Sequence, residues 1–120
     1  MKVLVVGYGS IGKRHVKNLL SYTRSQIIIC TKRRNITSLD KKRVKIFDSL
    51  SKCLLEKPDV GFITNETVYH VPTSIKLARE GIDLFIEKPL SNSMNGIMVL
   101  NCKRIVTFKV SFFHANIFYR

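Results

Sequence analysis

The sequence GYGSIG at residues 7–12 constrains the fold of this chain more than any other feature. It follows a run of strand-forming residues, MKVLVV, and leads into a segment with helical periodicity. A strand that ends in G-x-G-x-x-G and continues as a helix is typical of a turn whose backbone approaches a phosphate closely. The alternative is an ordinary strand-to-helix loop that is rich in glycine.

Each glycine has its own role in the phosphate-binding interpretation. Gly7 permits a tight turn, Gly9 removes a Cβ that would collide with a diphosphate, and Gly12 lets the helix pack close to the first strand. Free N–H groups near Ser10 and Ile11 then point at the phosphates, and the helix dipole adds to the attraction. We therefore expect a nucleotide-binding turn at this point of the chain.

Hydrophobic periodicity predicts that strands and helices alternate along the chain. The expected strands are residues 2–7, 26–31, 44–47, 60–64 and 83–87. The expected helices are residues 11–22, 49–56 and 72–80, with room for one short helix in 32–43, another in 92–102 and a sixth strand in 105–110. The strands are nearly continuous apolar runs, which indicates that both of their faces are covered. We predict an α/β fold, a doubly wound and mostly parallel sheet in a single domain.

Length and composition are consistent with one globular domain. The chain has 120 residues, of which 45% are hydrophobic, and this is too many for a disordered chain. No apolar run reaches the ~18 residues that a membrane-spanning helix needs, and the first residues lack the features of a signal peptide. We therefore expect a cytoplasmic protein without membrane contact.

The cysteines Cys30, Cys53 and Cys102 are widely spaced and form no C-x-x-C motif. This spacing argues against a zinc site or a redox pair, so no metal is expected. We expect each cysteine to behave as a small buried hydrophobic residue.

The chain carries a net charge of +13, and 14 of its 21 basic residues fall within residues 1–57. Such a charge favours anionic partners, which include nucleotides, nucleic acids and acidic surfaces. A solvated basic surface is the alternative. Because the basic residues are dispersed and no helix-turn-helix, zinc or RNA-binding motif is present, we do not expect nucleic acid to be the partner.

The segment after the second predicted strand bears on the choice of dinucleotide. A ribose with a free 2′-hydroxyl usually pairs with an acid about 20 residues beyond the glycines. Here that region, Thr31 to Arg34, contains no acid, and Asp40 lies well beyond the strand. Lys32, Arg33 and Arg34 would instead attract a 2′-phosphate, through charge-assisted hydrogen bonds worth roughly 1.5–3 kcal/mol each. This pattern favours NADP, while NAD, with a solvated basic loop, stays open.

Three motifs in this order, GYGSIGKRH, FITNETVYH and LFIEKPLS, give the chain a family resemblance. It resembles the N-terminal domain of the Gfo/Idh/MocA oxidoreductases over residues 1 to about 93. The resemblance implies a Rossmann domain that binds NAD or NADP. In the full-length family this domain serves hydride transfer between the nicotinamide and a sugar or polyol hydroxyl.

The resemblance also implies roles for residues that follow the later strands. Thr64 and Asn65 would line the cofactor near its ribose and nicotinamide, and His70 matches the family's histidine at the start of the next helix. Glu87 and Lys88 belong to the family's E-K-P motif, in which the lysine lies beside the nicotinamide and the substrate hydroxyl. Thr64, Asn65 and the segment Glu87-Lys88-Pro89 fall at the carboxyl ends of strands, where open α/β sheets bind ligands.

A lysine beside a cationic nicotinamide has its ammonium form disfavoured, so Lys88 is suited to moving a hydroxyl proton. The alternatives are a surface lysine before a turn proline, and for His70 a capping or merely polar histidine. We expect His15 to pack or to bond locally, without a chemical role. The candidate catalytic residues are Lys88 and His70. The candidate cofactor-binding residues are Gly7, Tyr8, Gly9, Ser10, Ile11, Gly12, Thr31, Lys32, Arg33, Thr64, Asn65, His70, Glu87 and Lys88.

Full members of the family carry a second, substrate-binding domain, and we expect this chain to lack it. We expect a dinucleotide-binding domain over residues 1–120, clear to about residue 93, in which 94–120 are either a divergent end or the truncated start of the missing domain. Enzymatic activity therefore stays open, and a non-catalytic NADP-binding module or a truncated subunit is the alternative. The aromatic end of the chain would suit a homo-oligomer or a partner subunit.

Overall fold

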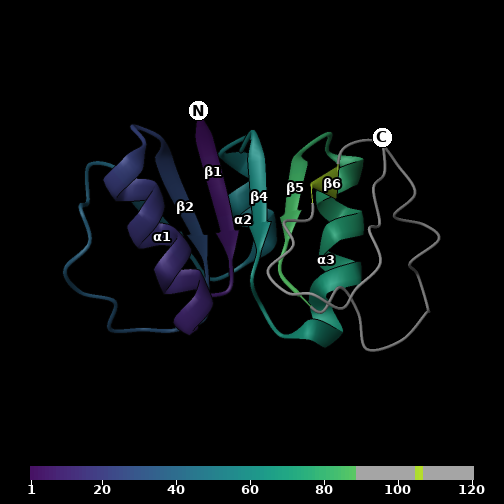
Figure 1. Ribbon diagram of the computed structural model, residues 1–120, viewed down its shortest axis with the longest axis horizontal. Coiled ribbons are helices and arrows are strands. Elements are labelled where there is room, and N and C mark those ends of the chain that lie inside the picture. The colour runs from purple at the N-terminus through teal and green to yellow at the C-terminus, as the bar shows by residue number, and fades with distance from the viewer. Residues whose placement is uncertain (89–104, 107–120) are drawn as a thin grey trace.

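The computed structural model describes residues 1–88 and 105–106 of the chain (Figure 1). Strands and helices alternate along it, as the hydrophobic pattern predicts. The elements are β1 (Lys2–Val6), α1 (Ser10–Tyr22), β2 (Gln26–Cys30), β3 (Val44–Phe47), α2 (Leu50–Leu55), β4 (Val60–Ile63), α3 (Thr67–Arg79), β5 (Asp83–Ile86) and β6 (Ile105–Val106).

The strands form one sheet in the order β3-β2-β1-β4-β5-β6, and every neighbouring pair is parallel. The chain builds one half of the sheet outward from β1 and then returns to place β4 on the other side of β1. The order therefore reverses between β1 and β4, and ligands bind outside the carboxyl ends of the strands at such a reversal. The predicted doubly wound α/β fold is confirmed.

Two hydrophobic clusters cover the two faces of the sheet, and alternate strand residues contribute to each. Within β1, Val3 and Val5 face α1, and they pack with Val16. Leu4 and Val6 face the other side, which α2 and α3 cover. Figure 1 shows α1 and α2 on opposite faces. The strands read as continuous apolar runs because both of their faces are buried.

Helix α3 begins at Thr67 and not at Pro72, so the predicted start was wrong. Proline is favoured in the first turn of a helix, which is why the sequence indicated a start there. The turn before it is helical because His70 and Val71 are 2% and 5% exposed and pack into the core. Pro72 lies inside the helix at the cost of one backbone hydrogen bond.

Residues 32–43 contain no helix, although the sequence left room for one. Asn35 and Ser38 have φ values of +61° and +65°, and such left-handed residues interrupt a helix. The carbonyl of Asp40 accepts the N–H groups of Arg43 and Val44, which leads the chain into β3. The expected helix over 92–102 lies outside the described residues, as does the part of the expected sixth strand beyond Val106.

The remaining elements match their predicted positions to within one or two residues. Ser49 caps α2, and its side-chain oxygen accepts a hydrogen bond from the N–H of Lys52. Cys53 is buried as predicted, whereas Cys30 is only partly buried. Among the described helices, none has the length and apolarity to cross a bilayer.

The core makes a direct prediction for leucine truncations. Leu77 on α3 is 0% exposed and packs over Gly61 of β4, so Leu77→Ala should lower the free energy of unfolding by about 2–5 kcal/mol. Leu55 on α2 is 82% exposed, so the control Leu55→Ala should change it by less than about 0.5 kcal/mol. Urea denaturation followed by circular dichroism measures both values. Similar losses in the two variants would contradict the packing described here.

Candidate functional site

Residues that directly follow strands gather at the carboxyl edge of the sheet. The N–H of Gly7 donates to the carbonyl of Cys30 at 3.0 Å, and the N–H of Thr64 donates to that of Val6 at 2.9 Å. The N–H of Glu87 continues the ladder between β5 and β4 in the same way, at 3.0 Å. The parallel register thus places the glycine turn beside the two later motifs.

Two of the three glycines in the first turn are required by the protein itself. Gly7 has a φ of +96°, and a Cβ there would lie 2.8 Å from the backbone of Asn65. A Cβ on Gly12 would lie 2.2 Å from the carbonyl oxygen of Gly7 and 3.0 Å from Oγ1 of Thr64. Any side chain at either position would push the turn away from the loop that follows β4.

Gly9 differs from the other two glycines. Its φ of −80° suits any residue, and a Cβ there would have no atom within 4 Å. Neither the backbone conformation nor the packing of the protein therefore explains a glycine at this position. The space that a Cβ would enter lies at the N-terminus of α1, where a bound diphosphate needs close contact with the backbone.

The N-terminus of α1 is built to receive an anion. Gly9 is the N-cap residue, no side chain caps the helix, and the first turn contains no acid. The first intrahelical bond joins the N–H of Lys13 to the carbonyl of Gly9, at 2.9 Å. The N–H groups of the first turn therefore have no acceptor within the helix and carry the positive end of its dipole. Ser10 and Ile11 are exposed there.

The side chain of Tyr8 is mostly buried in the cluster under α1, with Nζ of Lys13 5.7 Å from its ring centroid. At the surface of the glycine turn, Tyr8 therefore exposes its backbone and little of its side chain.

Thr64 and Asn65 connect the turn to the loop after β4. The hydroxyl of Thr64 donates toward the carbonyl oxygens of Val6 and Gly7, at 3.0 and 3.1 Å. Nδ2 of Asn65 donates to Oγ1 of Thr73 at 3.3 Å, while its buried Oδ1 has no hydrogen-bond partner among the described residues. Thr64 thus holds the turn in place, and Asn65 keeps an acceptor available to a ligand.

His70 lies in the first part of α3 and is 2% exposed. Its Nε2 lies 2.7 Å from the carbonyl oxygen of Asn65, and a carbonyl only accepts, so Nε2 carries the proton. The backbone carbonyl of His70 in turn accepts the hydroxyl of Ser74 at 2.5 Å. These contacts fasten the Asn65 loop to α3.

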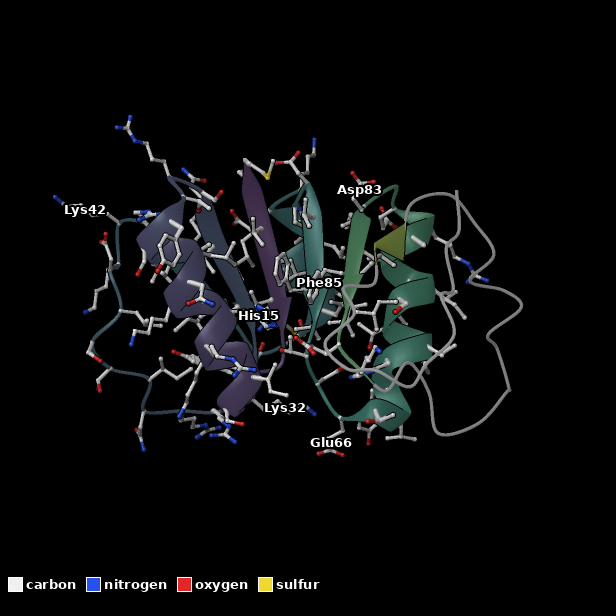
Figure 2. The ribbon with its side chains drawn as sticks, viewed as in Figure 1. His15, Lys32, Lys42, Glu66, Asp83 and Phe85 are labelled. Atoms are coloured by element: carbon white, nitrogen blue, oxygen red, sulfur yellow. The ribbon has the colours of Figure 1, made fainter. Side chains whose placement is uncertain are left out.

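His15 joins α1 to the segment after β5. Its Nε2 lies 2.5 Å from Oε1 of Glu87, and its ring meets Phe62 and Phe85 edge-on, with centroids 5.2 and 5.3 Å apart. Phe62 and Phe85 stack on each other at 4.7 Å, and Figure 2 shows His15 close to Phe85. His15 packs as expected, but its polar partner comes from 72 positions along the chain. Because His15 holds Glu87, the backbone that leads into Lys88 is fixed to α1.

Lys88 follows Glu87, and its Nζ is buried without a hydrogen-bond partner among the described residues. A buried amine without an acceptor costs free energy, which a bound ligand with oxygen atoms would recover. Asn65 and Lys88 thus both offer unpaired polar atoms at this edge of the sheet. The residues present fit a polar ligand, because Asn65 supplies an acceptor and Lys88 a donor.

A hollow of about 530 Å³ lies beside the ends of β2 and β3. Its lining residues are Thr31, Lys32, Arg33, Arg34, Ile46, Phe47, Asp48 and Lys52. Oγ1 of Thr31 accepts the N–H of Arg33 at 3.1 Å and shapes the start of this loop. Figure 2 places Lys32 at the carboxyl edge of the sheet. The predicted residues Thr31, Lys32 and Arg33 are therefore brought together at one hollow.

Asp48 and Lys52 also line this hollow, and the sequence did not indicate them as site residues. Nζ of Lys52 lies 2.8 Å from Oδ1 of Asp48. The hydrogen bond from Lys52 lowers the pKa of the Asp48 carboxyl, and the same bond raises the pKa of Lys52. Because β3 pairs in parallel with β2, Cys30 opposite Phe47, the residue after β3 had to lie at this edge. The pairing belongs to the tertiary structure, so no local signal in the sequence indicated this wall of the hollow.

The family model that describes an oxidoreductase family with an NAD-binding Rossmann fold matches residues 1–106. No curated protein sequence matches the chain.

Solved structures share the fold at low sequence identity. A Gfo/Idh/MocA family oxidoreductase from Vibrio cholerae has a TM-score of 0.73 and 18% identity, over 90% of this chain and 38% of its own. The myo-inositol 2-dehydrogenase from Lactobacillus plantarum has a TM-score of 0.68 and 18% identity, over 90% and 36%. The WlbA dehydrogenase from Bordetella pertussis, in complex with NADH and UDP-GlcNAcA, has a TM-score of 0.63 and 21% identity, over 78% and 29%. The matched region spans about a third of the length of these proteins.

The geometry of the glycine turn predicts that alanine destabilises the protein at Gly12 but not at Gly9. Gly12→Ala should lower the free energy of unfolding by about 1–3 kcal/mol, because its Cβ would overlap the carbonyl of Gly7. Gly9→Ala should change it by no more than about 0.5 kcal/mol, because its Cβ enters open space. Thermal unfolding without ligand measures both. A loss at Gly9 as large as that at Gly12 would show that Gly9 serves the fold.

Proposed function

This chain belongs to the Gfo/Idh/MocA oxidoreductase family and forms its NAD-binding Rossmann domain, and from that premise we propose how it holds the dinucleotide and which form it prefers. The observation that carries the proposal is Gly9. It is the one glycine of the turn that neither φ nor packing explains, at an uncapped helix N-terminus. A diphosphate against this backbone would accept hydrogen bonds from the first-turn N–H groups.

The preferred form is NADP, with the adenosine ribose in the hollow between β2 and β3. Lys32, Arg33 and Arg34 all line that hollow and offer positive charge to a 2′-phosphate. The one acid in the lining, Asp48, is paired with Lys52, which offsets its repulsion of a phosphate. With NAD instead, the same carboxylate would be available to a 2′-hydroxyl.

The nicotinamide end lies beside Asn65 and Lys88 in this proposal. When bound, the nicotinamide ring accepts or delivers a hydride. Lys88 offers a buried Nζ that would hold the substrate oxygen and exchange a proton with it, and Glu87, fixed by His15, keeps the Lys88 backbone in place. For His70, the hydrogen bond to the carbonyl of Asn65 supports a positioning role for the loop.

The substrate class proposed is a sugar or polyol hydroxyl. The names of the solved neighbours support this class, since they include a myo-inositol dehydrogenase and an enzyme in complex with UDP-GlcNAcA. Orientation of a substrate contributes several kcal/mol to catalysis. We therefore propose dinucleotide binding for this chain, and hydride transfer where a substrate-binding domain or partner subunit completes the site.

The test of dinucleotide binding is a titration with NADPH and NADH followed by nicotinamide fluorescence. Gly9→Val should weaken binding by about tenfold or more, because overpacking against the diphosphate costs about 1–3 kcal/mol. The unfolding midpoint without ligand should stay close to that of the parent chain, since the Cβ has no protein neighbour. Unchanged binding by a folded Gly9→Val chain would refute the diphosphate site.

The cofactor preference is tested by removing single charges. Lys32→Ala and Arg33→Ala should each weaken NADPH binding by roughly tenfold or more, the value of one charge-assisted hydrogen bond, and should affect NADH much less. The matched control is Arg24→Ala, which removes the same charge from the opposite edge of the sheet, beside Met1 and Asp59. If the control lowers NADPH affinity as much as the other two, general charge and not the hollow sets the preference.

A further inference from the structure

Two cysteines that are far apart in the sequence lie close to the hollow at the ends of β2 and β3. Cys30 is the last residue of β2, and Cys53 lies on α2. Cys30 lies on the same face of the sheet as Ile28, which is the face that α2 covers. It packs against the cluster that contains Cys53. Both side chains therefore belong to the same cluster, on the face of the sheet that α2 covers. The wide spacing in sequence therefore concealed a thiol pair.

The two thiols differ in exposure and in acidity. Cys53 is 0% exposed, whereas Cys30 is partly accessible to solvent. The hydrogen bond that Cys53 donates lowers the pKa of Cys30. That bond and burial together raise the pKa of Cys53. Cys30 is therefore the thiol that meets a reagent first, and Cys53 lies directly behind it.

We propose that Cys30 and Cys53 form a reversible disulfide that weakens dinucleotide binding in the adjoining hollow. The oxidant is a small disulfide of the glutathione class. The Cys30 thiolate attacks one sulfur of that disulfide, forms a mixed disulfide and releases one small thiolate. Cys53 then attacks the sulfur of Cys30 and expels the second small thiolate. Two protein thiols are oxidised, the reagent is reduced to two thiols, and the two protons end on these products.

The position of the pair explains why closure would reach the cofactor. Thr31 follows Cys30, Lys52 precedes Cys53, and both neighbours line the hollow. The carbonyl of Cys30 also accepts the N–H of Gly7, so it supports the glycine turn. An S–S bond of about 2.05 Å is shorter than any non-bonded contact of two thiols, so closure draws α2 toward the end of β2. This effect on binding rests on the proposed function, whereas formation of the disulfide does not.

The first experiment maps the disulfide in the full chain with Cys102→Ser, which removes the third thiol. After treatment with glutathione disulfide, alkylation and peptide mass analysis should show Cys30 linked to Cys53, and dithiothreitol should reverse the link. In Cys53→Ala the glutathione adduct should remain on Cys30, because no second thiol displaces it. In Cys30→Ser the buried Cys53 should stay unmodified. Circular dichroism checks that each variant is folded.

Two free thiols after oxidation, or links between chains only, would overturn the proposal. The second experiment titrates the reduced and the oxidised Cys102→Ser chain with NADPH. Oxidation should weaken NADPH binding by the Cys102→Ser chain about tenfold, which corresponds to the loss of one charge-assisted hydrogen bond. The same treatment should leave the NADPH affinity of the Cys30→Ser variant as it was before the treatment. A mapped disulfide with unchanged affinity would overturn the control of binding. If neither redox state binds NADPH or NADH, the proposed function and its control both fail, while the mass analysis still decides the disulfide.

Discussion

The close contact between the start of α1 and the end of β1 is the constraint on which the rest of the site depends. Gly12 packs so tightly on the carbonyl of Gly7 that an added Cβ would lie 2.2 Å from it, and Thr64 bonds to the same carbonyl. This contact places the uncapped N-terminus of α1 at the carboxyl edge of the sheet. The positive end of the helix dipole then lies at the edge of the sheet where the chain leaves β1 and β4 toward opposite faces. Gly9 completes the arrangement by leaving that place open.

The parallel ladder carries the same geometry across the sheet. Each strand ends in register with its neighbour, so the residues that follow the strands share one edge without any side-chain interaction to hold them there. Side chains then fix the details. His15 holds Glu87 from α1, and His70 holds Asn65 from α3. Oδ1 of Asn65 and Nζ of Lys88 are buried without a hydrogen-bond partner in the part of the chain that the structure describes. Among the described residues, the fold thus gives His15 and His70 polar partners and leaves polar atoms of Asn65 and Lys88 without one.

Much of the fold was predictable because the strands are apolar runs and the glycines mark the first turn. The start of α3 was not predictable in the same way. Pro72 is a local signal for a helix start, but burial of His70 and Val71 against the sheet overrides it. The missed wall of the hollow has a similar cause. Asp48 and Lys52 reach the site only because β3 pairs with β2, and nothing in their own neighbourhood indicates a ligand.

The sequence by itself determined the order of strands and helices, the glycine turn and the motifs after β4 and β5, because these depend on local periodicity and spacing. Tertiary structure alone decided which residues meet. It brought His15 to Glu87 over 72 positions, and it packed Cys30 against the cluster that contains Cys53. Such pairs depend on which strands are neighbours and which helix covers which face. The physical reason is that long-range contacts are set by the packing of whole elements, and no short segment of sequence contains that information.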